Sequence, residues 1–309
     1  MKCSILALAA LSLGFLPGCD ISTEPGEAPV AEDRIHIRAA WSPDGKTIAF
    51  HNATPATLGL YLVDTSGANL RLLYPGDAIG VTWSPDNQWL AFSLLGNLYK
   101  IRINGDSLTR LTIEPGSFRP AWSLDGQRIA FVRGRPFVLN VQNGTESDMF
   151  FAGNFPSWHP NGIELVVQET IRDGVSVGGL YRFHALNPNS LAVRTLHSFT
   201  STDDCGFSSI SPKGSDIVYG SKPFNGNAQV WKVTLASSQH TPLTDDSGDF
   251  PAWSPDGNKI VYTRTLEGDG GLWIMNADGT GKRRLTAPEV GSQRSEIRHQ
   301  KSDVSAIDP

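Results

Sequence analysis

One pattern of apolar and polar positions returns six times between residues 34 and 286. In each copy a large apolar residue, usually Trp, precedes a polar turn of the type Ser-Pro-Asp-Gly, and three apolar residues follow shortly afterwards. Ser, Pro and Gly are favoured at positions i, i+1 and i+3 of a type I turn, so each copy predicts a β-hairpin. The copies begin at Trp41, Trp83, Trp122, Trp158, Ile210 and Trp253, with a mean spacing of about 42 residues that is typical of a four-stranded propeller blade.

Two further strands are expected after each hairpin. A third apolar run, such as residues 98–101, is followed by a turn such as Asn104-Gly105 and by a short outer strand such as residues 110–112. Four strands in six copies predict an all-β protein, a six-bladed β-propeller of four-stranded antiparallel blades over residues 34–286. The recurring Trp is flat and large, and we expect it to fill the space between neighbouring blades.

The recurring phrase resembles the PD40, or WD40-like, repeat of TolB-type β-propellers. The resemblance rests on Trp-Ser-Pro-Asp-Gly, then Ile-Ala-Phe, and later Arg-Leu-Thr, and it covers roughly residues 34–286. It implies a propeller that acts by binding an envelope protein, a peptide segment or a cell-envelope polymer. Because some pectin-degrading lyases have similar repeats, the alternative is a propeller lyase or hydrolase acting on an envelope or extracellular polysaccharide. A structural envelope component without a discrete ligand is a second alternative.

The N-terminal region has the features of an export signal. Lys2 precedes an uncharged run over residues 4–16, which is too short to span a membrane but has the length of a signal-peptide core. The following Leu-Pro-Gly-Cys resembles the bacterial lipobox, which implies a signal peptide over residues 1–18 and lipidation of Cys19. The other interpretation is cleavage by ordinary signal peptidase nearby, with Cys19 unmodified.

Residues 20–33 carry five acidic residues, two prolines and no basic residue. Such a composition cannot bury an apolar core, so residues 19–33 are expected to be a lipidated Cys19 followed by a flexible acidic tether. The protein is therefore expected to be extracytoplasmic and membrane-anchored. The choice between periplasm and cell surface, and between inner and outer membrane, is left open by these residues.

Composition narrows the range of partners. The chain has 309 residues and a formal net charge of −5, without a basic block, which argues against nucleic-acid binding.

Residues 287–309 are polar and mixed in charge, and they predict a disordered tail. Cys205 is expected to be a buried or loop thiol and not a nucleophile. We expect a monomer.

Candidate binding residues follow from the geometry of a propeller blade. The loops between blades and the loops between second and third strands share one face, and their charges are unevenly distributed. We expect a polarised face that recognises a protein partner, and the alternative is a set of solvated turn residues. The acidic half comprises Asp203, Asp204, Asp245, Asp246, Asp249, Glu267 and Asp269, and the basic half comprises Arg119, Arg133 and Arg135.

No metal site, cofactor or catalytic group is predicted. The seven histidines show no i, i+2 or i, i+4 pairing of the kind that binds metals, and no Gly-rich phosphate loop leads from a strand into a helix.

Overall fold

The computed structural model describes residues 38–53, 57–172, 178–264 and 270–286. The signal peptide, Cys19, the tether, Glu267, Asp269 and the C-terminal tail lie outside the described residues, so their predicted roles stay predictions. The described part of the chain contains no helix that is long and apolar enough to cross a bilayer.

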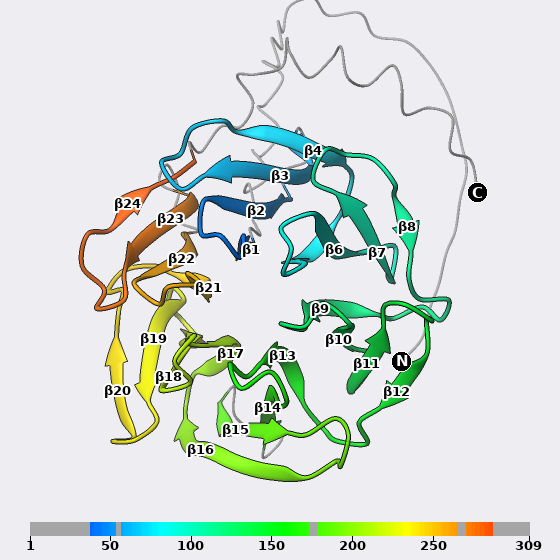
Figure 1. Cartoon of the computed structure of the whole chain (residues 1–309). Helices are drawn as coiled ribbons and strands as arrows, with labels where there is room; N and C mark the ends of the chain where they lie inside the picture. Colours follow the sequence, from blue (N-terminus) through cyan, green and yellow to red (C-terminus); the bar gives the residue numbers. More distant parts are fainter. Residues whose placement is uncertain (1–37, 54–56, 173–177, 265–269, 287–309) are drawn as a thin grey trace, which may run out of the picture. The chain divides into compact units, whose positions relative to one another are not determined.

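Six four-stranded antiparallel sheets are arranged as blades around a central channel (Figure 1). Each blade uses four consecutive strands, of which the first lies nearest the channel and the last at the rim. The predicted fold class is confirmed.

The blades follow one another in chain order. Blade 1 contains β1 (Ala39–Trp41), β2 (Thr47–Asn52), β3 (Gly59–Asp64) and β4 (Arg71–Pro75). Blade 2 contains β5 (Ile79–Trp83), β6 (Trp89–Leu94), β7 (Asn97–Arg102) and β8 (Thr109–Arg110). Blade 3 contains β9 (Phe118–Trp122), β10 (Arg128–Val132), β11 (Pro136–Asn140) and β12 (Glu146–Asp148). Blade 4 contains β13 (Asn154–Trp158), β14 (Leu165–Ile171), β15 (Gly179–Leu186) and β16 (Val193–Ser201). Blade 5 contains β17 (Asp204–Ile210), β18 (Asp216–Lys222), β19 (Gln229–Thr234) and β20 (Gln239–Pro242). Blade 6 contains β21 (Asp249–Trp253), β22 (Lys259–Arg264), β23 (Gly271–Asn276) and β24 (Arg283–Arg284).

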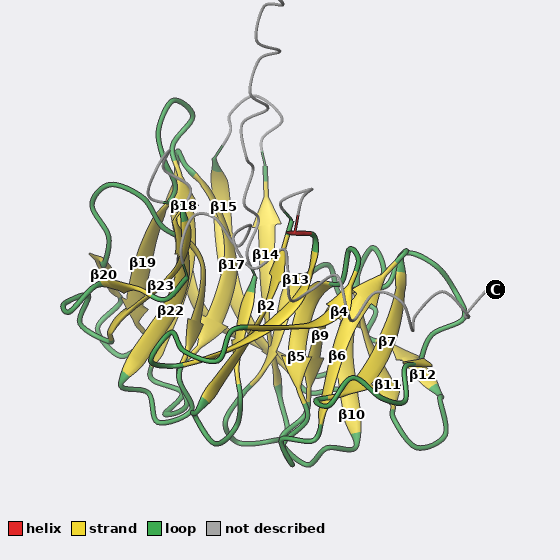
Figure 2. Ribbon diagram, turned by 90° about the horizontal axis from the view of Figure 1, so that it is seen from above, coloured by secondary structure: helices red, strands yellow, loops and turns green. Residues whose placement is uncertain are grey.

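The Ser-x-Asp-Gly phrase forms the turn between the first and second strands of a blade. In blade 1 the Ser42 hydroxyl donates to Asp44 Oδ1 at 2.6 Å and accepts the Thr47 N–H at 2.9 Å, while Gly45 adopts a left-handed φ of 70°. The same side-chain bond recurs at Ser84, Ser123 and Ser254. These turns all lie at one end of the blades, and the inter-blade loops lie at the other end, which we call the mouth face (Figure 2).

The recurring Trp joins three of the six blades to the one before. In three blades its indole N–H donates to the backbone carbonyl of the residue that precedes the corresponding Trp of the previous blade. The ring is closed by the same bond, because one of these pairs links blade 1 to blade 6. The pairs are Trp83 with Ala40 at 3.0 Å, Trp158 with Ala121 at 2.9 Å, and Trp41 with Ala252 at 3.2 Å.

The contribution of the hydrogen bond between Trp41 and Ala252 to stability can be measured, with the same substitution at Trp253 as the control. Trp41→Phe removes the donor to Ala252, whereas Trp253→Phe removes a buried indole N–H that has no acceptor in the described structure. Since both changes delete similar volume, we expect Trp41→Phe to be less stable than Trp253→Phe by about 1 kcal/mol, or about 2–4 °C in Tm. Thermal unfolding followed by circular dichroism gives the difference. Equal losses of stability in the two variants would show that the bond does not contribute to ring closure.

Candidate functional site

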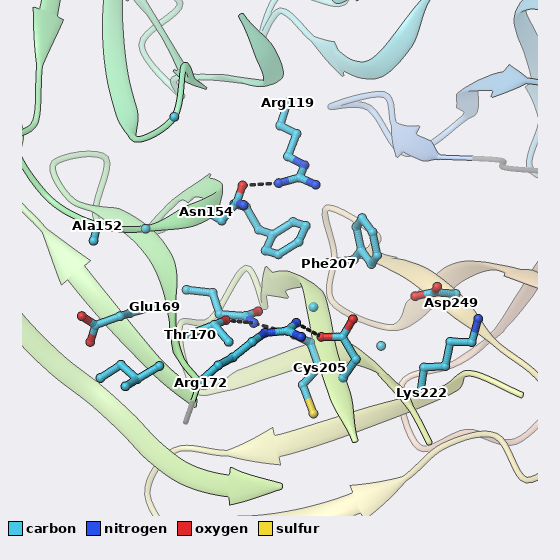
Figure 3. A pocket seen from close by; sticks show the side chains of 18 residues that line it. Arg119, Ala152, Asn154, Glu169, Thr170, Arg172, Cys205, Phe207, Lys222 and Asp249 are labelled. Atoms are coloured by element: carbon cyan, nitrogen blue, oxygen red, sulfur yellow. Dashed lines mark hydrogen bonds and ion pairs between the residues drawn. The ribbon is translucent and has the colours of Figure 1, made fainter. Parts of the chain in front are cut away.

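A cavity of about 690 Å³ lies at the mouth face. Its walls come from the first residues of β9, β13, β17 and β21 and from the last residues of β14 and β18, so blades 3 to 6 all contribute (Figure 3). All of these strand ends point toward the mouth face because first strands begin there and second strands end there. The cavity therefore lies where inter-blade loops converge on the channel.

Blades 4 and 5 contain the longest strands of the described structure, and the ends of some of these strands line the cavity. The strands β14 to β18 have seven to nine residues, while every other strand has six or fewer. In Figure 2 strands β14, β15 and β18 rise on the side of the mouth face. One signal in the sequence could have located this region, because Trp158 and Ile210 are 52 positions apart, more than any other consecutive pair of copies.

Six residues, five of them with side chains, approach the channel from equivalent positions, three residues before the Trp or Ile that begins each copy. At five of these positions φ lies between 52° and 68°, a left-handed conformation that is uncommon for residues other than Gly. All five of these first strands also show a shift of pairing register there, as expected of a β-bulge that redirects a side chain. We call the set the channel ring, and its members are Arg38, Gly80, Arg119, Phe155, Phe207 and Phe250.

The aromatic members of the channel ring are in contact. The ring centroids of Phe155 and Phe207 are 4.8 Å apart, and those of Phe207 and Phe250 are 4.1 Å apart. The guanidinium carbon of Arg119 lies 4.2 Å from the Phe155 centroid, and that of Arg38 lies 4.7 Å from the Phe207 centroid. Cation–π contacts of this length hold a guanidinium in place and leave its charge uncompensated.

Three of the predicted binding residues meet in the cavity. Arg119, Asp204 and Asp249 all line it, and each begins or nearly begins a first strand. Figure 3 labels Arg119 and Asp249. Asp204 pairs with Arg172 at 2.6 Å, and Arg119 donates to the amide oxygen of Asn154. The structure thus places these three side chains around one cavity, together with Arg172 and Asn154, which the sequence analysis did not single out.

The other predicted residues that the structure describes are held by local partners outside the cavity. Each of the two other arginines forms an ion pair with a carboxylate on β12, which the sequence analysis did not count. The Asp203 carboxylate accepts a hydrogen bond from Ser221 at 2.8 Å. The ion pairs are Arg133 with Glu146 at 2.6 Å, Arg135 with Asp148, Asp246 with Arg264, and Asp245 with Lys282 at 3.8 Å.

Asp249 has the most perturbed carboxyl group in the cavity. Burial raises its pKa to about 6, against the opposing effects of the Phe250 N–H, Arg38 and Lys222. Its Oδ1 accepts the Phe250 N–H at 2.8 Å and lies over Gly220, where a Cβ would come within 2.2 Å of that oxygen. A glycine is thus required at position 220 for this carboxylate to occupy its place.

Cys205 is buried in the wall of the cavity, as expected from the sequence, and burial raises the pKa of its thiol. A raised thiol pKa opposes formation of the nucleophilic thiolate. Its backbone carbonyl accepts a hydrogen bond of 2.8 Å from the buried amide of Gln168. Within the described ranges no group of three or more His, Cys, Asp or Glu side chains is placed to hold a metal ion.

Comparison with known proteins points to one class of propeller. No protein-family model matches the chain. It is similar to the Tol-Pal system protein TolB of Francisella tularensis, with 24% identity over 241 residues that cover 70% of this chain and 53% of the relative. An uncharacterized protein of Agrobacterium fabrum is 29% identical over 151 residues, which cover 40% of this chain and 52% of that protein. The chain thus spans about half the length of these curated relatives.

Solved structures show the same architecture. TolB from Acinetobacter baumannii superposes with a TM-score of 0.61 and 19% identity, covering 80% of this chain and 62% of that chain. An oligogalacturonate lyase from Vibrio parahaemolyticus superposes with a TM-score of 0.53 and 12% identity, covering 82% of this chain and 80% of that chain. At these identities the superpositions show the fold alone. Taken with the sequence relatives, they support a TolB-like six-bladed β-propeller.

Proposed function

We propose that this protein is a lipid-anchored, extracytoplasmic binding module of the bacterial cell envelope that captures a protein partner at its mouth face. The observation that carries the proposal is the cavity, which gathers charged side chains from four blades at one end of the channel. The similarity to a Tol-Pal system protein supports a role in a protein assembly. The resemblance of residues 16–19 to a lipobox supports lipidation of Cys19 and, with it, a location at a membrane surface.

Exposed apolar side chains around the cavity favour a protein as the partner. Protein interfaces have cores enriched in aromatic and apolar residues, whereas solvated turns rarely need them. On the mouth face such side chains occur in loops or at strand ends of blades 2 to 5. They are Leu95, Ile113, Phe118, Phe150, Ile171 and Phe224, with exposed fractions between 42% and 86%.

We also propose that the charged residues of this face steer the partner. Asp245 and Asp246 remain partly exposed although each has a cationic neighbour, with 90% and 53% of their side chains accessible. Surface charges of this kind change association rates more than final affinity. Ion pairs reduce the charge of both halves, through Arg133 and Arg135 in the basic half and through Asp204 and Asp246 in the acidic half.

The partner-binding proposal predicts that one apolar residue of the mouth face is indispensable for capture. Phe150 is 75% exposed in the loop between blades 3 and 4, and Phe150→Asp places a charge there without disturbing the core. Leu124, which is 56% exposed in the turn at the opposite end of blade 3, supplies the control Leu124→Asp. We expect Phe150→Asp to lower capture of the partner at least tenfold, because a buried unpaired charge costs more than 1.4 kcal/mol, while Leu124→Asp captures like the wild type.

The measurement is affinity capture of the full anchored chain from its own envelope after cross-linking, with quantitative mass spectrometry of the captured proteins. A partner that is retained equally by both variants would contradict the proposed face.

One observation favours the alternative of a polysaccharide-degrading enzyme. A carboxyl group with a pKa of about 6, such as that of Asp249, is suited to general acid–base catalysis near neutral pH. Incubation of the wild type with oligogalacturonides and other acidic oligosaccharides tests this alternative. Turnover that is lost in Asp249→Asn, together with no captured protein, would favour the enzyme.

A further inference from the structure

The charged groups at the cavity that form no ion pair with one another carry a net positive charge. Asp204 is neutralised by Arg172 at 2.6 Å, and Glu169 is contacted by Arg182 and by His184, both at 3.2 Å. Three cations then remain without an ion pair among the described residues, and a single carboxylate, that of Asp249, remains to oppose them. The cations are Arg38 and Arg119 of the channel ring and Lys222 at the end of β18.

Arg119 presents a free hydrogen-bonding edge. Its guanidinium lies with its carbon 4.2 Å from the Phe155 centroid, and only its Nη1 atom donates to a described residue, the amide oxygen of Asn154. The Nε and Nη2 groups therefore have no acceptor in the described part of the chain. These two groups form the edge that binds a carboxylate through two parallel hydrogen bonds.

The surroundings of Arg119 increase its attraction for an anion. Arg38 lies with its guanidinium carbon 4.7 Å from the Phe207 centroid, and the guanidinium carbon of Arg119 lies 5.8 Å from the same centroid. Burial and the nearby Arg119 lower the pKa of Arg38 to about 10, so Arg38 is still cationic at neutral pH. Two partly desolvated guanidinium groups in contact with one phenylalanine ring favour the binding of an anion.

We propose that the cavity binds the carboxylate of an acidic side chain on the protein partner, with the Nε–Nη2 edge of Arg119 as its ligand. Arg38 and Lys222 supply the additional positive charge. The apolar rings of Phe155 and Phe207 suit the methylene arm of Asp or Glu, and the apolar mouth face favours a protein over a polysaccharide as the source. This inference rests on the proposed function and names the chemistry that the binding site recognises.

The experiment follows the side-chain NMR signal of Arg119. The full chain in detergent micelles is labelled with ¹⁵N-arginine, and the Nε–Hε peak of Arg119 is identified by its absence in Arg119→Lys. We titrate with N-acetyl-glutamate amide and, as the uncharged isostere, N-acetyl-glutamine amide. The expected result is a saturable shift of this peak with the glutamate compound only. Arg38→Gln is expected to weaken that binding about three- to fivefold, and Arg194→Gln, which alters an ion pair with Glu164 outside the cavity, should leave it unchanged.

Each other outcome overturns the inference in a defined way. Equal shifts with both compounds, or none, would show that Arg119 does not recognise a carboxylate. Tighter binding of inorganic phosphate would replace the carboxylate by a phosphate group. Binding of trigalacturonate without binding of the glutamate compound would make a uronic acid the ligand. Loss of partner capture in Phe150→Asp tests the proposed function separately, because Phe150 does not line the cavity.

Discussion

Gly67→Ala is expected to destabilise the propeller by about 2–5 kcal/mol, by disturbing the contact that closes the ring. Gly67 lies in the turn between β3 and β4 with φ of 92°, and a Cβ there would stand 2.9 Å from the backbone carbonyl oxygen of Leu285 in blade 6. A left-handed φ costs a residue with a Cβ about 1–2 kcal/mol, and overpacking against a backbone atom adds about 1–3 kcal/mol. Thermal unfolding of the purified chain measures the sum.

Gly144→Ala isolates the contribution of the contact. Gly144 occupies the corresponding turn of blade 3 with φ of 72°, and a Cβ there would meet nothing within 4 Å. This variant should therefore lose only the conformational part, about 1–2 kcal/mol. If Gly67→Ala and Gly144→Ala lose the same free energy of unfolding, the chain adjusts to the added Cβ between blades 1 and 6 at little cost. The contact of Gly67 with Leu285 would then not limit closure of the ring.

The fold could be predicted from the sequence because its information is local and repeated. Ser42, Asp44 and Gly45 form a turn with bonds that span at most five residues, and the same bonds recur in other copies. The role of Trp41 also followed from its size and recurrence. The repeat could not identify the hydrogen-bond acceptor of each Trp, because Trp41 and its acceptor Ala252 are 211 positions apart.

The candidate site could be predicted only in outline. The topology of a blade correctly placed Arg119, Asp204 and Asp249 at one end of the molecule. The net charge of that end depended on pairings such as Arg133 with Glu146, which join residues 13 positions apart across a loop and are not visible in a count of loop charges.

The channel ring contradicts local preference, which is why it was not predicted. Arg119 and Phe207 adopt left-handed conformations with φ of 57° and 54°, which their side chains disfavour in a short peptide. Packing of neighbouring blades imposes them, and the bulge that results directs both side chains into the channel.

Asp249→Asn is expected to raise stability at pH 8 and to have little effect at pH 4. The pKa of Asp249 is about 6 in the folded protein and about 3.8 in the unfolded chain. Between these values the folded state holds a proton that the unfolded state has released, so stability falls as pH rises from about 4 to 6 and then stays low. A difference of about two pKa units corresponds to a penalty of about 3 kcal/mol above pH 6, which Asn does not incur.

Calorimetric Tm values between pH 4 and pH 8 measure this penalty. For a domain of this size the gain at pH 8 corresponds to roughly 6–12 °C. Asp256→Asn is the control of opposite sign, because the Ser254 hydroxyl lowers the pKa of Asp256 in its turn, and blade 4 already has Asn161 at the equivalent place. That variant should be less stable than the wild type by a constant amount from pH 4 to pH 8, because the stabilisation by ionised Asp256 is lost only below its ordinary pKa of 3.8.

A stabilised Asp249→Asn variant would also bear on function. The hydrogen bond from the Phe250 N–H does not require a carboxylate, because the amide oxygen of Asn154 accepts the equivalent bond from the Phe155 N–H in blade 4. A destabilising charge at position 249 therefore calls for a reason other than folding. A carboxylate that destabilises the folded protein is expected where ligand binding or proton transfer requires a negative charge beside Arg38 and Lys222. If the Tm of Asp249→Asn instead follows the wild type at every pH, the carboxylate is solvated in the folded protein and this argument for a functional cavity fails.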